Sequence, residues 1–526
     1  MRFYAVSLLS IVFAPLCLSQ TPQKAASCHV NTVQESPAQI KNDRFEFKEA
    51  AALFVAELKE NPKNSTLRAG QIRNLADNQQ LEEADTLATA FVVEDPSSGT
   101  ALTAKAYVLY AQGKLAESYA TNAASQKLDP CQARTYLYLS DYERSIANWK
   151  SAWDHIQLAH KLDPLSDDIL KGWIDFLPYR DALEARKARA LTTPVLTEEQ
   201  RNRIVGAVDK ALATPPKPLG CRPGTAAAGT SVKLSEQALA PGVVVTTIPM
   251  SINGKTKHLI LDTGASGIML TAVAASNLGL TAEQRGYVGG FGDDKLTSVK
   301  STHLKSVHIG DVEFTNCEAL VTSGVGGFAD GIVGGDVFHE FLLSLDLSHG
   351  LITLDSLPQR PDKLPNPSSV LYSDAGDVDE AGTVHYRNRY IDSSMTGWTP
   401  FYLIETKLLL PTQINTSAPS LFMIDTGSDF TLAQTGTVKP FTKLQESSDD
   451  LVGFSGRVKN TYRTGPLVLH FAGLYQPMSS MIALDTIPST LSTTVGGILG
   501  LPTWRQVVLR LDYRDHLMKV EIPPKK

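Results

Sequence analysis

The chain has 526 residues, more than a single hydrophobic core usually holds, so about two to four domains are expected. Hydrophobic residues make up 43% of the sequence and charged residues 20%, a composition typical of a soluble globular protein. The formal net charge of −6 argues against a nucleic acid or an acidic membrane as partner, because both require a basic surface.

The N-terminus, residues 1–19, has the pattern of a secretory signal peptide. Arg2 precedes an apolar run from Ala5 to Leu18. About 14 apolar residues are too few to span a bilayer comfortably, so we expect cleavage near Ser19 rather than a membrane anchor. No later segment is long and apolar enough to cross a membrane, so we predict a secreted or periplasmic protein without a stable span after signal removal.

Four cysteines follow the predicted signal: Cys28, Cys131, Cys221 and Cys317. They form no CxxC pair, so neither a zinc ribbon nor a redox motif is indicated. An exported chain can form disulfides, and four cysteines allow three pairings among which the sequence does not choose. A role as small buried apolar residues is equally open.

Residues 44–190 have the apolar spacing of helices and carry an internal repeat. Four prolines recur every 34 residues, at Pro62, Pro96, Pro130 and Pro164. Small residues occupy equivalent places at the same interval, at Ala84, Ser118 and Ala152. This pattern resembles the tetratricopeptide repeat over about three repeats plus flanking helices, in which proline sets the turn between helix pairs. An irregular helical bundle is the alternative.

The pattern changes twice after the repeats. Residues 191–241 are rich in Pro and Gly and are predicted to be a linker, interrupted by one helix over Glu198 to Leu212. From Val243 onward, short runs of Val, Ile, Leu, Thr and Phe are broken by Gly and Asp, which indicates strands and turns.

The β-rich half contains an ordered duplication. Matching segments lie 163 residues apart at Leu259–Gly264 and Phe422–Gly427, and at Gly290-Phe291 and Gly453-Phe454. Further matches lie 166 residues apart at Gly331–Gly334 and Gly497–Gly500, and at Leu345-Asp346 and Leu511-Asp512. The duplication predicts two similar lobes, residues 242–355 and 401–526, joined by an inter-lobe connection over 356–400.

Each lobe carries one Asp-Thr-Gly triplet after an apolar strand, beginning at Asp262 and Asp425. Two carboxylates held close together cannot both ionise, so one keeps a proton. The charged member can then take a proton from water while the neutral member donates one to a substrate carbonyl oxygen. The pair titrates as a unit, so neither role is assigned to one aspartate. Ordinary Asp-Gly turns are the alternative for each triplet alone.

Both copies resemble the lobes of retropepsin- and pepsin-type aspartic peptidases. The resemblance covers residues 243–521 and implies an all-β, bilobal fold of two pseudo-symmetric β-barrel lobes, with substrate bound as an extended strand beneath a flap. It implies catalytic roles for Asp262 and Asp425, with flap candidates over Tyr287 to Asp293 and Val452 to Arg457. The loops that carry the two aspartates are called the active loops. The residues expected to support them are Thr263, Gly264, Thr426, Gly427 and Ser428. Flap or substrate-binding roles are expected for Gly289, Gly290, Phe291, Gly453, Phe454 and Asp429.

Two departures from the family pattern have consequences. Ala265 stands where pepsin-like lobes place a hydroxyl residue, and the loss of that hydrogen bond should raise the carboxylate pKa and move the optimum toward neutral pH. The pepsin flap tyrosine has no clear counterpart, because Tyr287 lies at the base of the predicted flap. We expect Tyr287 to be a packing residue.

The sequence therefore predicts a multidomain exported aspartic endopeptidase, with all-α tetratricopeptide-like repeats that recruit a protein substrate or partner. A catalytically inactive peptide-binding protein on the same fold is the main alternative, and a homodimer with intermolecular lobe pairing is another; a monomer is favoured. No cofactor is expected. No metal is expected either, because Leu343 stands where a second histidine should follow His339-Glu340.

Overall fold

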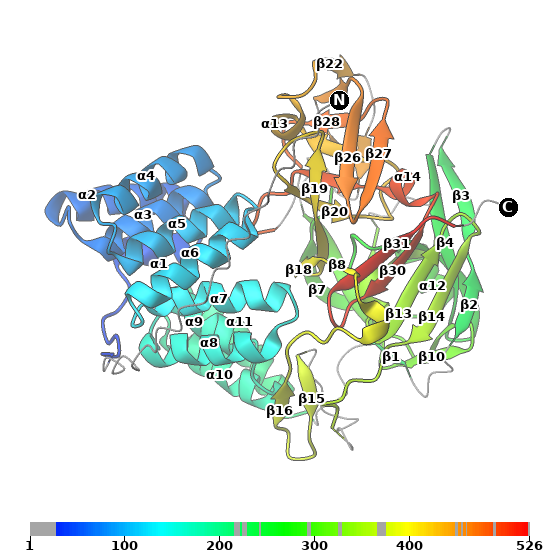
Figure 1. Ribbon diagram of the computed structural model, residues 1–526. Helices are drawn as coiled ribbons and strands as arrows, with labels where there is room; N and C mark the ends of the chain where they lie inside the picture. Colours follow the sequence, from blue (N-terminus) through cyan, green and yellow to red (C-terminus); the bar gives the residue numbers. More distant parts are fainter. Residues whose placement is uncertain are drawn as a thin grey trace, which may run out of the picture.

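A computed structural model gives the fold of the chain. It describes residues 28–214, 221–223, 229–240, 243–291, 296–323, 329–364, 375–447, 451–453, 456–458, 460–487 and 491–523. The predicted signal peptide, residues 1–19, lies outside the described residues. A helical region over residues 37–212 is followed by a β-rich region, and the two lie side by side (Figure 1). This order of an all-α part and a β-rich part confirms the predicted fold class.

The helices of the N-terminal region keep the 34-residue period. One set begins at 34-residue intervals: α2 (Phe47–Glu60), α4 (Leu81–Glu94), α6 (Leu115–Leu128) and α8 (Trp149–Leu162). The other set does the same: α3 (Ser65–Asp77), α5 (Gly99–Ala111), α7 (Ala133–Ser145) and α9 (Asp167–Ile174). Each predicted turn proline follows a helix of the first set by two residues. Three helices flank these pairs: α1 (Pro37–Asp43), α10 (Tyr179–Thr192) and α11 (Glu198–Leu212). The further likeness to tetratricopeptide repeats stays a prediction.

Small side chains bring paired helices into close contact at equivalent places. Ala84 and Ala152 are fully buried and Ser118 is 3% exposed. The Ser118 hydroxyl donates a 2.7 Å hydrogen bond to the Ala106 carbonyl of the preceding helix. A larger residue at any of the three positions would push the two helices of a pair apart.

Two large sheets of the β-rich region have the same strand order. The first runs β10 (Val312–Thr315), β9 (Val307–Ile309), β4 (Val243–Ile252), β5 (Lys255–Asp262), β12 (Gly331–Gly334), β6 (Ile268–Thr271), β11 (Glu318–Thr322), β8 (Thr297–His303) and β7 (Glu283–Val288). The second runs β27 (Leu474–Met478), β26 (Leu467–Phe471), β19 (Lys407–Ile414), β20 (Ser420–Ile424), β29 (Gly497–Leu499), β21 (Leu432–Gln434), β28 (Ile482–Leu484), β25 (Thr461–Thr464) and β22 (Leu444–Ser447). The sequence duplication therefore corresponds to a duplicated topology.

A third sheet joins the two lobes. Its six strands are β17 (Thr399–Pro400), β31 (Leu517–Glu521), β30 (Val508–Asp512), β13 (Phe341–Asp346), β14 (Leu351–Ser356) and β2 (Thr230–Lys233). Strand β13 of the first lobe pairs antiparallel with β30 of the second, and Leu343 faces Leu511 across the pair. Both leucines are fully buried, so the sheet contributes to a core that the lobes share.

Shorter elements complete the region. Strands β1 (Arg222–Pro223) and β3 (Ser235–Ala240) extend the first sheet, and β18 (Tyr402–Ile404) pairs with β19. Two small hairpins are β15 (Gly376–Val378) with β16 (Val384–Tyr386), and β23 (Leu451–Gly453) with β24 (Gly456–Val458). The short helices are α12 (Ala272–Asn277), α13 (Thr435–Val438), α14 (Leu501–Trp504), η1 (Gly335–Phe338) and η2 (Ser393–Met395). The domain boundaries stay predictions, and strand pairing crosses them, because β2 and β3 lie within 191–241 and pair with β14 and β4.

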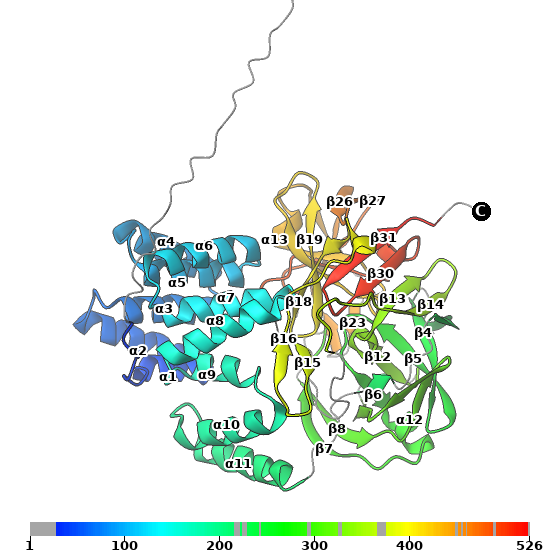
Figure 2. The same cartoon turned by 60° about the horizontal axis from the view of Figure 1, so that its bottom comes forward.

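The helical region packs directly on the second lobe (Figure 2). The turn after α5 meets the segment before β29: the Thr494 amide donates a 2.8 Å hydrogen bond to the Ala111 carbonyl, and the Thr493 hydroxyl a 2.6 Å bond to the Tyr110 carbonyl. Gly113 has a φ of +79°, and a Cβ there would lie 2.7 Å from the Thr494 carbonyl oxygen. Glycine is therefore required where the two regions meet.

Two disulfides fix the pairing that the sequence left open. Cys28 bonds to Cys131 of the helical region, and Cys221 of the segment 191–241 bonds to Cys317 of the first lobe. They close loops with sequence separations of 103 and 96 residues. Cross-links over loops of this length restrict the unfolded chain and typically contribute about 2–4 kcal/mol each.

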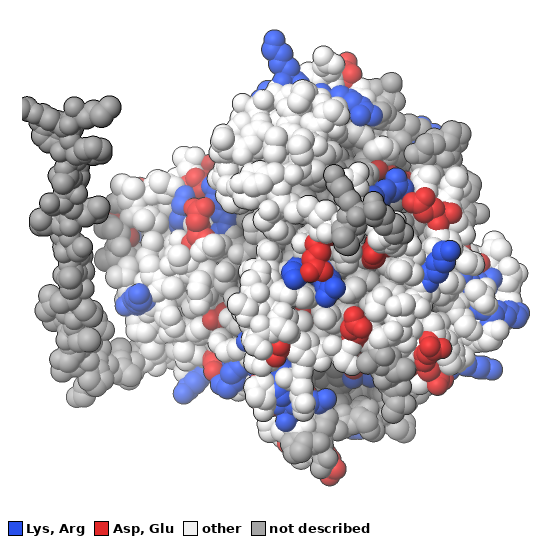
Figure 3. Space-filling view, turned by 45° about the vertical axis from the view of Figure 1, so that its right-hand side comes forward, with Lys and Arg blue, Asp and Glu red and all other residues white. Residues whose placement is uncertain are grey.

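The surface carries both signs of charge. On the face shown in Figure 3, acidic and basic side chains are interspersed and neither sign forms a continuous patch. Among the residues that the structure describes, no helix combines the length and the apolar character needed to cross a bilayer.

Candidate active site

Asp262 and Asp425 occupy equivalent places in the two lobes. Asp262 ends β5, and Asp425 directly follows β20. Each strand has a parallel neighbour that supports the loop: Gly334 of β12 faces Asp262 in the strand register, and the Asp425 amide donates a 3.1 Å hydrogen bond to the Leu499 carbonyl of β29. The predicted supporting segments thus lie beside the two aspartates.

Thr263 and Thr426 join the two loops by a symmetric set of hydrogen bonds. The amide of each residue donates to the hydroxyl of the other, at 3.0 Å in both directions. The Thr263 hydroxyl donates to the Ile424 carbonyl at 3.0 Å, and the Thr426 hydroxyl donates to the Leu261 carbonyl at 2.8 Å. Both threonines are buried, so water does not compete for these bonds.

The two glycines allow the carboxyls to face each other. A Cβ on Gly264 would lie 2.7 Å from the Asp425 Cγ, and a Cβ on Gly427 would lie 2.4 Å from the Asp262 Cγ. The Gly264 amide donates to Asp262 Oδ1 at 2.7 Å, and the Gly427 amide donates to Asp425 Oδ1 at 2.9 Å. Each aspartate therefore lies against the backbone of the opposite loop, with its own glycine amide orienting it.

The electrostatics of the pair favour one shared proton. The two carboxyls are hydrogen-bonded to each other. Loss of hydration raises the pKa of Asp262 above its ordinary value. The same cause, together with the Asp262 charge, raises the pKa of Asp425 well above its ordinary value. The arrangement thus places one acid and one carboxylate in contact.

The residues that follow the glycines differ between the lobes. The Ser428 amide donates a 3.1 Å hydrogen bond to Asp425 Oδ1, while its hydroxyl donates to the Phe430 carbonyl at 2.9 Å. Ala265 has no hydroxyl, and its amide donates to the Asp262 carbonyl at 3.2 Å. Asp429 follows Ser428, and burial raises its pKa to about 6 against the opposing effect of Arg505.

The flap candidates of the two lobes meet each other. Gly289, Gly290 and Phe291 follow β7, and Phe291 packs against the apolar cluster that includes Leu451 of the second hairpin. A Cβ on Gly453 would lie 2.1 Å from the Phe291 carbonyl oxygen. The hairpins of both lobes thus come together, while the predicted residue Phe454 lies outside the described residues.

Tyr287 is placed differently from the expectation. Its side chain is 69% exposed, so the prediction that it is a packing residue is wrong. Residues 283–288 form strand β7, whose pairing with β8 shifts register between Gln284 and Gly286. A register shift of this kind changes the face on which the following side chains lie, and the spacing of residues along the sequence does not reveal it.

The sequence interpretation missed Lys407 beside the pair. The Lys407 ammonium donates a hydrogen bond to the Gly264 carbonyl, and its charge lowers the pKa of both aspartates. A usable signal was present in the sequence, because Lys407 directly precedes the apolar run Leu408–Leu410. A lysine next to a buried strand predicts a carboxylate nearby.

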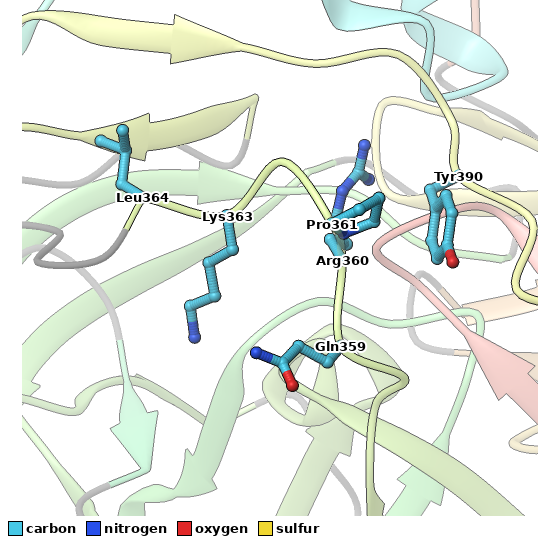
Figure 4. A pocket seen from close by; sticks show the side chains of 6 residues that line it. All are labelled: Gln359, Arg360, Pro361, Lys363, Leu364 and Tyr390. Carbon is cyan, nitrogen blue, oxygen red and sulfur yellow. The ribbon is translucent and has the colours of Figure 1, made fainter.

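A separate pocket lies in the inter-lobe connection (Figure 4). It is lined by Gln359, Arg360, Pro361, Lys363, Leu364 and Tyr390. Arg360 donates a 2.7 Å hydrogen bond to Asp515 and lies 5.7 Å from the centre of the Tyr390 ring. This arginine therefore anchors the connection to the joining sheet. Within the described part of the chain, no group of three or more His, Cys, Asp or Glu residues could hold a metal ion.

A comparison with protein-family models finds a match over the first of the two loops. Residues 248–337, which include the first Asp-Thr-Gly loop, match a family model described as Aspartyl protease. Among solved structures, the aspartic proteinase from Irpex lacteus aligns with 56% of this chain and 97% of its own, at 13% identity and a TM-score of 0.34. No curated protein matches the sequence.

The β-rich region is thus a two-lobed structure with paired aspartates at equivalent loops. It is similar to the pepsin- and retropepsin-like aspartic peptidases, as the sequence predicted. The matched segment lies within the first lobe, and the second lobe repeats the strand order of the first.

Proposed function

We propose that this chain is an exported aspartic endopeptidase that hydrolyses peptide bonds with water activated between Asp262 and Asp425. The observation that carries the proposal is the contact of these two carboxyls, each oriented by the glycine amide of its own loop. Two face-to-face carboxyls, one of them protonated, supply the general base and the general acid that amide hydrolysis without a metal requires.

The chemistry follows from the single proton that the two carboxyls share. The pair titrates as a unit, so the scheme is written with this proton on Asp425 and holds equally with the two roles exchanged. Asp262 then takes a proton from water as the water oxygen attacks the substrate carbonyl carbon. Asp425 gives its proton to the carbonyl oxygen, which produces a neutral tetrahedral diol. Collapse of the diol breaks the C–N bond: one diol hydroxyl returns its proton to Asp425 as the C=O bond forms, and the leaving nitrogen takes the proton held by Asp262, which restores the singly protonated pair.

The position of the flaps supports binding of the substrate as an extended segment. Gly289, Gly290, Phe291 and Gly453 lie at the hairpins of the two lobes, where backbone amides and carbonyls can bond a peptide main chain. We propose the same location for Asp429. The raised pKa values of both catalytic carboxyls support an optimum nearer neutral pH than that of a digestive enzyme.

Two disulfides support an oxidising compartment, so the proposal retains a secreted or periplasmic location. We also propose that the helical repeats bind a protein substrate or partner and that the enzyme acts as a monomer. Exposed Val55 on α2 and Val93 on α4, at 60% and 76% exposure, are candidate contacts. A V55D/V93D double variant should raise the KM for a folded protein substrate and leave the KM for a short peptide unchanged.

A peptide-library digest with the mature chain tests the proposed activity. We expect cleavage by the wild-type protein, inhibition by a statine-type transition-state analogue, and loss of at least about 1000-fold in kcat with Asp262→Asn or Asp425→Asn. The alternative, an inactive peptide-binding protein, predicts binding without cleavage and equal behaviour of all three proteins. Cleavage that persists in both asparagine variants would overturn the assignment of the two aspartates.

A further inference from the structure

Lys407 begins β19, the strand that pairs with β20, and Asp425 directly follows β20. Leu409 of β19 faces Met423 of β20 in this antiparallel pair. Extending the register by two residues places Lys407 opposite Asp425, and residues opposite each other in an antiparallel pair direct their side chains to the same face. The lysine is therefore located where it can act on the carboxyl pair.

At the equivalent position the first lobe has an apolar residue, Val245. Thr247 faces Ile260 in the equivalent strand pair, and the same extension places Val245 opposite Asp262. Val245 is 4% exposed and apolar. Lys407 thus breaks the symmetry of the two lobes at the position that the extended register places opposite an aspartate.

The ammonium group of Lys407 reaches across to the first lobe. It donates a hydrogen bond to the Gly264 carbonyl. The amide of the same glycine orients Asp262, at 2.7 Å from its Oδ1. One half-buried cation of the second lobe therefore touches the loop that holds the aspartate of the first.

A tight turn directly precedes Lys407. Ile404 faces Lys407 in the hairpin of β18 and β19, so Glu405 and Thr406 form a two-residue turn. Their φ angles are +57° and +111°. Turns of this kind favour Asn and Gly, and a β-branched residue at positive φ costs about 1–3 kcal/mol. Strain of this size persists only where the surroundings hold the backbone in place.

The helical region supplies that support. Tyr402 of β18 lies edge-on to Tyr142 of α7, with ring centres 5.9 Å apart. Ile404 is 6% exposed within an apolar cluster that includes Leu115 of α6 and Leu421 of β20. Strand β18 of the hairpin is therefore packed against the helical region, which supports the turn before Lys407.

We propose that Lys407 is a positioning residue for the paired aspartates, bonding the active loop of one lobe from the other and stabilising the singly charged pair. This inference rests on the proposed peptidase function. The cation opposes the loss of hydration that raises the pKa values of Asp262 and Asp425. It therefore moves the pH range in which the pair carries one proton toward lower pH.

Other charged groups surround the pair and remain in place when Lys407 is changed. Glu405 interacts with Lys407 from the hairpin turn. Asp336 accepts a 2.7 Å hydrogen bond from the Ser266 hydroxyl beside the first loop. The Tyr513 phenol lies near Asp262 from the joining sheet, and burial raises its pKa well above the ordinary value, so it stays neutral. Burial raises the pKa of Asp429 on the second loop, and the charge of Arg505 acts in the opposite direction and lowers it.

The test compares the pH dependence of kcat/KM for wild type, Lys407→Met and Lys407→Arg. We expect both limbs of the Lys407→Met profile to move upward by about one pH unit, because a nearby cation typically shifts a carboxyl pKa by that amount. Lys407→Arg should keep the wild-type profile. Lys443→Met, at an exposed lysine of the same lobe, is the matched control and should also keep it.

A lower kcat for Lys407→Met with unmoved limbs would show a structural role alone and would overturn the inference. Absence of cleavage by the wild-type protein would instead overturn the peptidase function, and an Asp425→Asn variant as active as wild type would overturn the role of Asp425, so these failures are distinguishable from failure of the inference. Carbon-13 NMR titration of the aspartate carboxyls in the full chain adds a readout that is independent of turnover. An upward shift of the pair in the Lys407→Met protein supports the inference, and unchanged titration overturns it.

Discussion

Thr263 and Thr426 each donate an amide hydrogen bond to the hydroxyl of the other, at an equal distance of 3.0 Å. This contact fixes the positions of the two aspartate loops relative to each other. Thr263→Val removes the hydroxyl that accepts one of these bonds and donates to the Ile424 carbonyl. We expect the free energy of unfolding to fall by about 2–4 kcal/mol, because two buried partners lose their bonds.

The same substitution should lower kcat/KM by about 100-fold, because the two carboxyls lose their fixed separation. Chemical denaturation and peptide hydrolysis measure the two effects. Thr263→Ser is the control, since it keeps the hydroxyl and should keep most of both quantities. A valine variant with full activity would show that the threonine contact does not position the aspartates.

Gly427→Ala should lower kcat by about 100-fold through steric contact. The added Cβ would lie 2.4 Å from the Asp262 Cγ, closer than side-chain atoms approach each other. The aspartate must therefore move, and a displacement of about 1 Å can cost about 100-fold in rate. Gly436→Ala, at a position where a Cβ meets nothing within 4 Å, is the matched control. Equal kcat values for the two variants would contradict the crowding of the pair.

Asp425→Asn should stabilise the fold at neutral pH while removing activity. A carboxyl whose folded pKa is raised contributes stability that is present at low pH and is lost as the pH rises through the folded pKa. The asparagine does not ionise and avoids this loss. We therefore expect the free energy of unfolding to be higher than that of wild type by about 1–3 kcal/mol at pH 7, and the difference to disappear below about pH 4. Thermal unfolding over this pH range measures the gain, with exposed Asp311→Asn as control.

A second buried carboxyl, in the helical region, gives an independent pH prediction. Burial raises the pKa of Asp43 to about 8, and the Asp168 and Glu35 charges add to the shift. Stability is therefore lost as the pH rises from about 4 toward 8. Asp43→Asn can still accept the 2.6 Å hydrogen bond from Gln39 and should be more stable by about 2 kcal/mol at pH 8, but not at pH 4.

Glu60→Gln, at an exposed carboxyl of α2, serves as the control for Asp43→Asn. Denaturant unfolding at the two pH values measures the difference between the variants and wild type. If Asp43→Asn raised the free energy of unfolding equally at both pH values, the charge of Asp43 would not be the cause of the increase.

Local patterns in the sequence predict much of this fold. The proline spacing predicts the 34-residue helix period, and the repeated triplets predict the two loops that carry Asp262 and Asp425. These features depend on residues close together in the chain, or on a duplication that the sequence displays directly. The bounds of α11, Glu198–Leu212, follow from helical periodicity in the same way.

Features that depend on distant contacts could not be predicted. The choice of Cys28 with Cys131 requires the packing of the N-terminal segment on the helices, which no local pattern encodes. Lys407 reaches Gly264 from 143 residues away, through a strand register that only the folded sheet defines. The exposure of Tyr287 depends on a register shift within its own hairpin.

The sheet that joins the lobes has a consequence for biosynthesis. Strand β13 of the first lobe pairs with β30 of the second, and β30 pairs in turn with β31. Strand β13 therefore lacks its partner β30 until the second lobe has been synthesised. The Asp262 loop likewise gains its partner, the Asp425 loop, only from the second lobe.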